Sequence, residues 1–139
     1  MNKKIKVFIA VGGTGGHVFP GYNLATHLIE TNYDVELISD MRGRKYLKKI
    51  NSFKISIMPA SRLMTRNMLT KIISLIMIFF SVLRSIIFLI FNRPKIIFGM
   101  GGYASFPICF AATILRIKFI IYENECINLC KPFNAPRIK

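Results

Sequence analysis

Residues that could bind an anionic ligand lie in two glycine-rich segments, each directly after a short apolar run. The first segment reads GGTGGH at residues 12–17, and the second reads GMGGY at residues 99–103. Glycine lets the backbone adopt positive φ and approach a ligand closely. The amides that open a following helix point at an anion, with the helix dipole behind them. We therefore predict two strand–turn–helix units whose loops face one ligand.

The first segment offers the backbone of Gly13, Thr14, Gly15 and Gly16 to a diphosphate or another oxyanion. It lacks the G-x-G-x-x-G fingerprint of dinucleotide sites and the G-K-[ST] of an ATP-binding P-loop. NAD and ATP therefore lose their main support in the sequence, and we expect no cofactor.

His17 opens the helix that follows this loop and is a candidate general base for a sugar hydroxyl; the alternative is a histidine that only bonds to backbone. Glu123 follows the last predicted strand and could orient a sugar hydroxyl or balance His17, or could be a solvated loop carboxylate. Tyr103 could stack on a ligand or be an aromatic at the rim.

The cysteines do not form a metal-binding pattern. The three thiols, Cys109, Cys126 and Cys130, are odd in number and lack paired C-x-x-C spacing or nearby histidines. We expect free thiols and no metal site.

The charge is strongly positive and unevenly distributed. The net charge is +14, and no acidic residue lies between residues 41 and 122. Such a field favours an anionic partner, such as nucleic acid, an anionic membrane or a phosphorylated ligand; a general compositional bias towards lysine would explain it in part. No recognition helix or aromatic platform supports a nucleic-acid partner.

The chain alternates strand and helix patterns, which indicates an α/β domain with a doubly wound, Rossmann-like parallel sheet. We predict strands at residues 4–11, 34–38, 53–57, 95–98 and 118–122, and helices at residues 16–30, 42–50, 68–91 and 105–115. Ligands of such sheets bind beyond the carboxyl ends of the strands, where both glycine segments and Glu123 fall.

The segment Met68–Phe91 is apolar enough to resemble a membrane span, but Lys71 and Arg84 interrupt it. A span needs about 20 predominantly apolar residues. On a helical wheel its polar residues fall in one arc and its apolar residues on the other face. We favour an amphipathic helix packed on the sheet or lying on a bilayer; a true span is the alternative.

Three motifs together resemble the N-terminal domain of the MurG family of bacterial glycosyltransferases (glycosyltransferase family 28): GGTGGHVFP at residues 12–20, GMGGYASFP at 99–107 and IIYENE at 120–125. The resemblance implies the N-terminal half of a GT-B fold over residues 1–125, which binds the lipid-linked acceptor, followed by a divergent tail at 126–139. In this family UDP-GlcNAc is bound mainly by a C-terminal domain, which we expect to be absent from the chain.

The resemblance also assigns roles to residues. Thr14, Gly15 and Gly16 would touch the sugar donor. The same loop, which also includes Gly13 as a substrate-binding residue, would hold the acceptor diphosphate together with the segment Gly101-Gly102-Tyr103. His17 would be the base and Glu123 a supporting catalytic residue. The membrane patch would include a set of basic and apolar residues: Arg62, Arg66, Lys71, Ile72, Leu75, Ile76, Phe79 and Phe80.

The chain departs from the family at its third motif. The family has H-E-Q-N where this chain has Tyr122-Glu123-Asn124-Glu125. The donor-contacting asparagine is therefore replaced by glutamate, with Asn124 one place earlier as the candidate substitute.

Two functions follow from these observations. The first is the acceptor-binding half of a transferase that converts lipid I to lipid II in peptidoglycan synthesis, inactive alone. Such a chain is a fragment, a truncated or degenerate gene product, or a half-enzyme completed by a separate donor-binding chain. The second is a non-catalytic module that docks lipid-linked or phosphorylated ligands on an anionic membrane. Either would place the chain peripherally on the cytoplasmic face of the bacterial plasma membrane.

Overall fold

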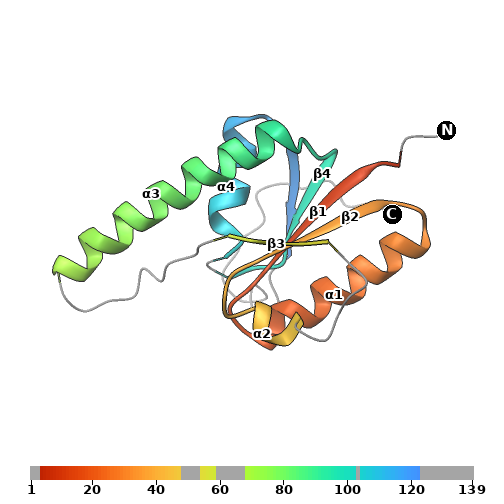
Figure 1. Ribbon diagram of the computed structural model, residues 1–139, viewed down its shortest axis with the longest axis horizontal. Helices are drawn as coiled ribbons and strands as arrows, with labels where there is room; N and C mark the ends of the chain where they lie inside the picture. The colour runs from red at the N-terminus through yellow and green to blue at the C-terminus, as the bar shows by residue number, and fades with distance from the viewer. Residues whose placement is uncertain (1–3, 48–53, 59–67, 103, 123–139) are drawn as a thin grey trace, which may run out of the picture.

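The computed structural model describes residues 4–47, 54–58, 68–102 and 104–122; within helix α3 the side chains of Met68 and Thr70 are not described. Strands and helices alternate throughout this part of the chain (Figure 1). The elements are β1 (Lys6–Val11), α1 (Gly15–Glu30), β2 (Asp34–Ser39), α2 (Arg44–Leu47), β3 (Lys54–Ile57), α3 (Met68–Phe91), β4 (Ile96–Gly99), α4 (Phe106–Ile114) and β5 (Lys118–Ile121).

The strands form one parallel sheet in the order β3-β2-β1-β4-β5. Helices α1 and α2 cover one face, and α3 and α4 cover the other (Figure 1). This is the predicted doubly wound, Rossmann-like architecture. The strand order reverses between β1 and β4, and a ligand crevice forms at such a switch point because the loops after the two strands leave in opposite directions.

The core lies on both faces of the sheet, so the central strands are apolar on both sides. On the α3–α4 side Phe8, Leu89 and Ile108 are fully buried. On the α1 side Ile9 and Val18 are buried in a second cluster. The helix and strand boundaries agree with the sequence to within one or two residues, except that α2 is shorter within the described residues than the predicted 42–50.

The residues of the polar arc of helix α3 do not all lie in the same environment. The serines of that arc, Ser74, Ser81 and Ser85, are buried, whereas Lys71 and Arg84 are exposed. Ser85 Oγ donates to the Ser81 carbonyl at 2.8 Å, so its hydroxyl is satisfied within the helix. Small side chains let α3 approach the domain closely, and most of its large apolar side chains are consequently left outside.

Candidate functional site

The two glycine loops meet at the carboxyl edge of β1 and β4. Gly12, after β1, packs against Ala104 from the loop after β4. A Cβ atom at Gly102 would lie 3.5 Å from the Gly12 carbonyl oxygen. The predicted convergence of these loops on one place is therefore what the structure shows.

His17 lies in this junction, against the backbone of the second loop. A Cβ atom at Gly101 would lie 3.1 Å from His17 Nδ1, and one at Gly102 would lie 3.5 Å from His17 Cδ2. The ring therefore lies close against this loop, and a Cβ atom at Gly101 would be a tighter contact than most Cβ atoms make. The imidazole, a proton acceptor when neutral, thus stands beside both predicted ligand-binding loops.

The glycines are also required by backbone conformation at three positions. Gly13, Gly101 and Gly102 have φ of 81°, 81° and 76°, in the left-handed region that other residues avoid. Gly15 has no positive φ; a Cβ atom there would instead lie 3.0 Å from the ring of Phe19. Glycine is therefore required at position 13 by the backbone conformation and favoured at position 15 by the close ring of Phe19.

The start of α1 has backbone donors that remain available. Thr14 is the N-cap but makes no side-chain bond to the helix. Among the described residues, no acceptor pairs with the amides of Gly15 and Gly16. Two amides at a helix N-terminus, next to the second loop, are suited to a phosphate oxygen.

Asp40 is a residue of this site that the sequence motifs did not identify. It follows β2 and is 2% exposed, and its Oδ1 accepts hydrogen bonds from the amides of Gly13 at 3.1 Å and Gly43 at 2.7 Å. Arg42 Nε donates to its other oxygen at 3.0 Å. The carboxylate therefore holds the first glycine loop in place, and the Gly13 amide is not free for a ligand.

The environment of Asp40 favours its charged form. Burial by itself raises the pKa, but the bonds from Gly43, Gly13 and Arg42 outweigh it, so that the pKa of Asp40 lies below its ordinary value of 3.8. An acid at the end of the second strand of a βαβ unit was the signal that could have found it.

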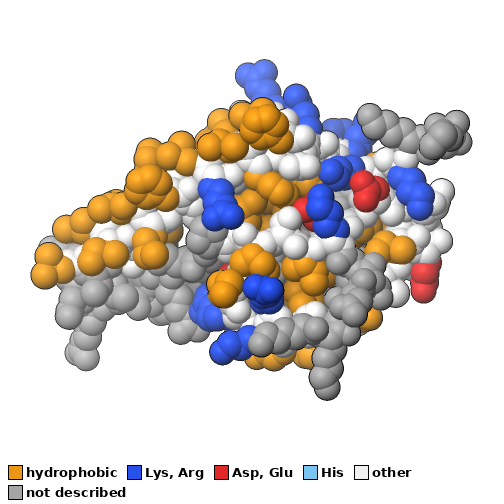
Figure 2. All heavy atoms as spheres, viewed as in Figure 1, with side chains coloured by type: hydrophobic (Ala, Val, Ile, Leu, Met, Phe, Trp, Pro, Cys, Tyr) orange, Lys and Arg blue, Asp and Glu red, His pale blue; other side chains and the backbone are white. Residues whose placement is uncertain are grey.

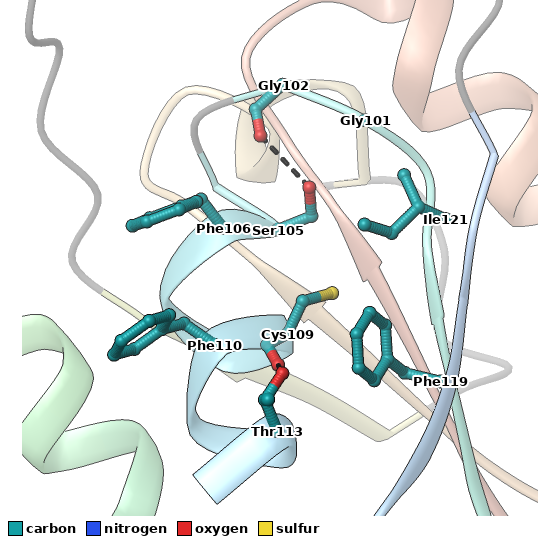
Figure 3. A pocket seen from close by; sticks show the side chains of 9 residues that line it. All are labelled: Gly101, Gly102, Ser105, Phe106, Cys109, Phe110, Thr113, Phe119 and Ile121. Carbon is teal, nitrogen blue, oxygen red and sulfur yellow. Dashed lines mark hydrogen bonds between the residues drawn. The ribbon is translucent and has the colours of Figure 1, made fainter. Parts of the chain in front are cut away.

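A cavity of about 320 Å³ opens beneath the second loop, between α4 and β5 (Figure 3). Ser105 Oγ donates to the Gly102 carbonyl at 2.9 Å and thereby fixes the loop at the start of α4. Below this point the walls are mainly apolar. The lining residues are Gly101, Gly102, Ser105, Phe106, Cys109, Phe110, Thr113, Phe119 and Ile121.

Cys109 forms part of that wall and is a buried free thiol. Burial raises its pKa to about 11, so it is protonated at neutral pH. No group of three or more His, Cys, Asp or Glu side chains within the described residues could hold a metal ion.

Helix α3 presents an extended apolar surface to solvent (Figure 2). Phe79 is 62% exposed and Phe80 is 65% exposed, although a globular protein usually leaves no such contiguous apolar surface open. Lys71 is exposed on the same helix. Of the residues predicted for a membrane patch, those described are all exposed: Lys71, Ile72, Leu75, Ile76, Phe79 and Phe80.

Residues Lys71–Phe91 are also long and apolar enough to cross a membrane by length and composition. The core helix of a soluble protein passes the same test when it is mostly buried, but only 28% of this window is buried within the domain. The helix therefore differs from an ordinary core helix.

Several predicted site residues lie outside the described residues: Tyr103, Glu123, Asn124, Arg62 and Arg66, as do Cys126 and Cys130. Their predicted roles stay predictions. The nearest described residue to Glu123 is Tyr122, whose carbonyl oxygen would lie 3.3 Å from a Cβ atom at Gly101. Tyr122, the last described residue, therefore lies at the same junction as His17.

Comparison with known families gives one matching model, the glycosyltransferase family 28 N-terminal domain, over residues 7–138. Curated relatives carry the name UDP-N-acetylglucosamine–N-acetylmuramyl-(pentapeptide) pyrophosphoryl-undecaprenol N-acetylglucosamine transferase. The one from Pelagibacter ubique is 39% identical over 127 residues, and covers 91% of this chain and 34% of its own length. One from Rhizobium etli is 36% identical over 141 residues, covering 100% of this chain and 37% of its own length. The chain thus spans about a third of these relatives.

Solved structures share the fold. MurG of Acinetobacter baumannii superposes with a TM-score of 0.66 at 23% identity, over 86% of this chain and 34% of that one. A UDP-N-acetylglucosamine 2-epimerase gives a TM-score of 0.63 at 15% identity, covering 86% of this chain and 33% of that one. At these identities the likeness establishes the architecture and nothing finer.

Proposed function

The chain belongs to glycosyltransferase family 28, matching the family's N-terminal domain, and on that premise we propose that it forms the acceptor-binding half of an N-acetylglucosamine transferase. The acceptor would be lipid I and the product lipid II, as the name of the curated relatives implies for those proteins. The observation that carries this proposal is the junction of the two glycine loops around His17 at the switch point of the sheet.

The acceptor diphosphate would lie between the free amides at the start of α1 and the Gly101–Gly102 loop. A diphosphate is a double oxyanion, and both loops offer backbone at a place where no side chain obstructs it. The net charge of +14 adds a field that attracts such a ligand. Tyr103, which lies outside the described residues, would complete the loop.

His17 would act as the general base that takes the proton from the attacking sugar hydroxyl. The imidazole is within reach of a ligand held by either loop, because it touches both. Glu123 and Asn124 would follow from the same junction as supporting residues. Removing the proton makes the hydroxyl oxygen a nucleophile towards the anomeric carbon of the donor sugar, and UDP leaves.

The donor, UDP-GlcNAc, would be bound only in part here, by Thr14, Gly15 and Gly16. The relatives are about three times as long as this chain, so most donor contacts would come from a further domain, in the same protein or in a separate chain. We assign residues 1–125 to the acceptor domain and residues 126–139 to a tail.

A membrane contact would bring this site to a lipid-linked acceptor. The exposed face of α3 would lie on the cytoplasmic surface of the plasma membrane, with Lys71 near the headgroups. Arg62 and Arg66, outside the described residues, would add to the attraction. A contact of this kind would make the protein a peripheral membrane protein.

The rival function is a membrane-docking module that binds lipid-linked diphosphates without catalysis. The departure at Glu123-Asn124-Glu125 favours it, because the family's donor-contacting asparagine is replaced there. Both functions require acceptor binding, whereas only the transferase requires His17.

The experiment is titration of the 139-residue chain with a soluble lipid I analogue, carrying the sugar, peptide and diphosphate on a short lipid. Saturable binding that inorganic diphosphate competes away is the expected result. Absence of binding in a chain that gives the circular dichroism of an α/β fold would contradict both functions.

A further inference from the structure

A second apolar cavity, of about 450 Å³, lies between α3 and α4. Its wall on α3 is a stripe at helical spacing, and its wall on α4 consists of three side chains four residues apart. The lining residues are Leu75, Ile78, Phe79, Val82, Leu83, Ile86, Phe106, Phe110 and Ile114. We call this the α3–α4 groove.

The groove adjoins the cavity beneath the Gly101–Gly102 loop. Phe106 and Phe110 line both, and their rings stack with centroids 5.8 Å apart. Figure 3 shows this pair on α4, with Phe106 near Ser105 and the glycine loop, and Phe110 one turn farther along. An apolar path therefore starts beside the loop and runs along α4 towards Ile114.

The other side of the groove leads to the exposed face of α3. Phe79 lines the groove and is itself part of that exposed surface. On α4 the path from Phe106 to Ile114 is about 12 Å long at 1.5 Å per residue. Every residue of the groove is a hydrocarbon or aromatic side chain, so it has no polar group to bind a peptide backbone or a sugar.

We propose that the α3–α4 groove binds the first isoprene units of the lipid chain that is attached to the acceptor diphosphate. This inference rests on the proposed function, because the diphosphate must occupy the glycine loops. The chain would leave the diphosphate at Gly102, cross Phe106 and Phe110, and run past Ile114 while the remainder stays in the bilayer against α3.

Two features of the groove favour a prenyl chain over a protein partner. The groove shares Phe106 and Phe110 with the cavity beneath the Gly101–Gly102 loop, so a chain covalently attached to a diphosphate at that loop can pass from the cavity into the groove. The groove also contains no charged or hydrogen-bonding group. The polar side chains at the edges of a docked protein helix would therefore find no partner in it.

The test is a chain-length series, measured by isothermal titration calorimetry on the 139-residue chain. The ligands are inorganic diphosphate and prenyl diphosphates of five, ten and fifteen carbons, with farnesol as the uncharged comparison. Each buried methylene contributes about fourfold in affinity. We therefore expect at least a tenfold gain for each added isoprene unit, and weak binding of farnesol.

A pair of variants locates the effect. Ile114→Trp enlarges an exposed side chain at the far end of the groove, and Ile29→Trp makes the same change near the end of α1; the two isoleucines are 54% and 38% exposed. Affinities are expressed relative to inorganic diphosphate for each variant. We expect Ile114→Trp to reduce the gain from ten to fifteen carbons at least fivefold, and Ile29→Trp to keep it.

The remaining outcomes separate this inference from the proposed function. Binding of inorganic diphosphate with no gain from the prenyl chain overturns the groove but leaves the acceptor site standing. Failure of every ligand to bind contradicts both. Equal binding of farnesol and farnesyl diphosphate, or a change of oligomeric state in Ile114→Trp without a change in the series, also overturns the proposal.

Discussion

The imidazole of His17 packs against the backbone of Gly101. A Cβ atom added to Gly101 would lie 3.1 Å from His17 Nδ1. This contact joins the start of α1 to the loop after β4, two segments that are far apart in the sequence. It places the imidazole at the boundary of the two loops that we propose bind the acceptor diphosphate, and it is the basis of the first two predictions.

His17→Ala should separate binding from transfer. The substitution leaves the amides of Gly15 and Gly16 in place, so we expect binding of a soluble lipid I analogue to change less than about threefold. Transfer of GlcNAc should fall by about 10²–10⁴-fold, as for loss of a general base. The transfer measurement uses the equivalent change in a full-length relative. Loss of binding would make His17 a binding residue, and unchanged transfer would make Glu123 the next candidate.

Gly102 should tolerate no side chain without a loss of acceptor binding. Its φ of 76° disfavours any L-residue by about 1–2 kcal/mol, and a branched side chain would also press on His17. We expect Gly102→Ala to weaken diphosphate binding moderately and Gly102→Val to abolish it, measured by calorimetry. Equal affinities for the alanine and valine variants would show that steric contact with His17 is unimportant.

Asp40→Asn should destabilise the domain in a pH-dependent manner. Because folding lowers the pKa of Asp40, its carboxylate stabilises the folded state above pH 3.8, and this contribution is lost as the pH falls through the lowered pKa. Loss of charged hydrogen bonds to Gly13 and Gly43 should cost about 1–3 kcal/mol at pH 7. Urea unfolding of the wild type and the variant at pH 7 and at pH 3 measures the loss of unfolding free energy and its dependence on pH. Asp34→Asn, at the exposed start of β2, is the control and should have a much smaller effect.

The apolar face of α3 should bind anionic vesicles. Each basic residue near the surface contributes about 1 kcal/mol, so flotation with anionic vesicles should decrease at high salt. The double variant Ile76→Ser with Phe80→Ser should lose most binding while remaining folded, because both side chains are exposed. Ile29→Ser is the matched control on α1. Equal binding to neutral and anionic vesicles would contradict the electrostatic part, and resistance to carbonate extraction would indicate a span instead.

The 139-residue chain by itself should give no turnover with UDP-GlcNAc and lipid I. Most donor contacts would come from residues beyond the third of the relatives' length that this chain matches. A radiolabelled transfer assay with the purified chain measures this, and a full-length relative is the positive control. Steady formation of product by the chain would show that it binds the donor unaided.

The sequence alone determined the architecture and the position of the glycine loops. Apolar runs of strand length alternate with helical patterns, and each run ends in a local signal, such as the glycines after β1 and β4 or Pro94 after α3. These signals act through backbone conformation over a few residues, so they can be read without tertiary contacts. The parallel sheet then follows from chain connectivity.

Only the tertiary structure decided which groups meet. It brought Asp40 to the amide of Gly13 and His17 to Gly101, contacts that depend on strand order and on the space left by missing side chains. It also decided which side of α3 packs against the domain. The helical wheel groups Ser81 and Ser85 with Arg84 by polarity, whereas packing selected the serines because they are small and left Arg84 outside. Polarity is a property of the residue, but close approach between two elements depends on both of their surfaces.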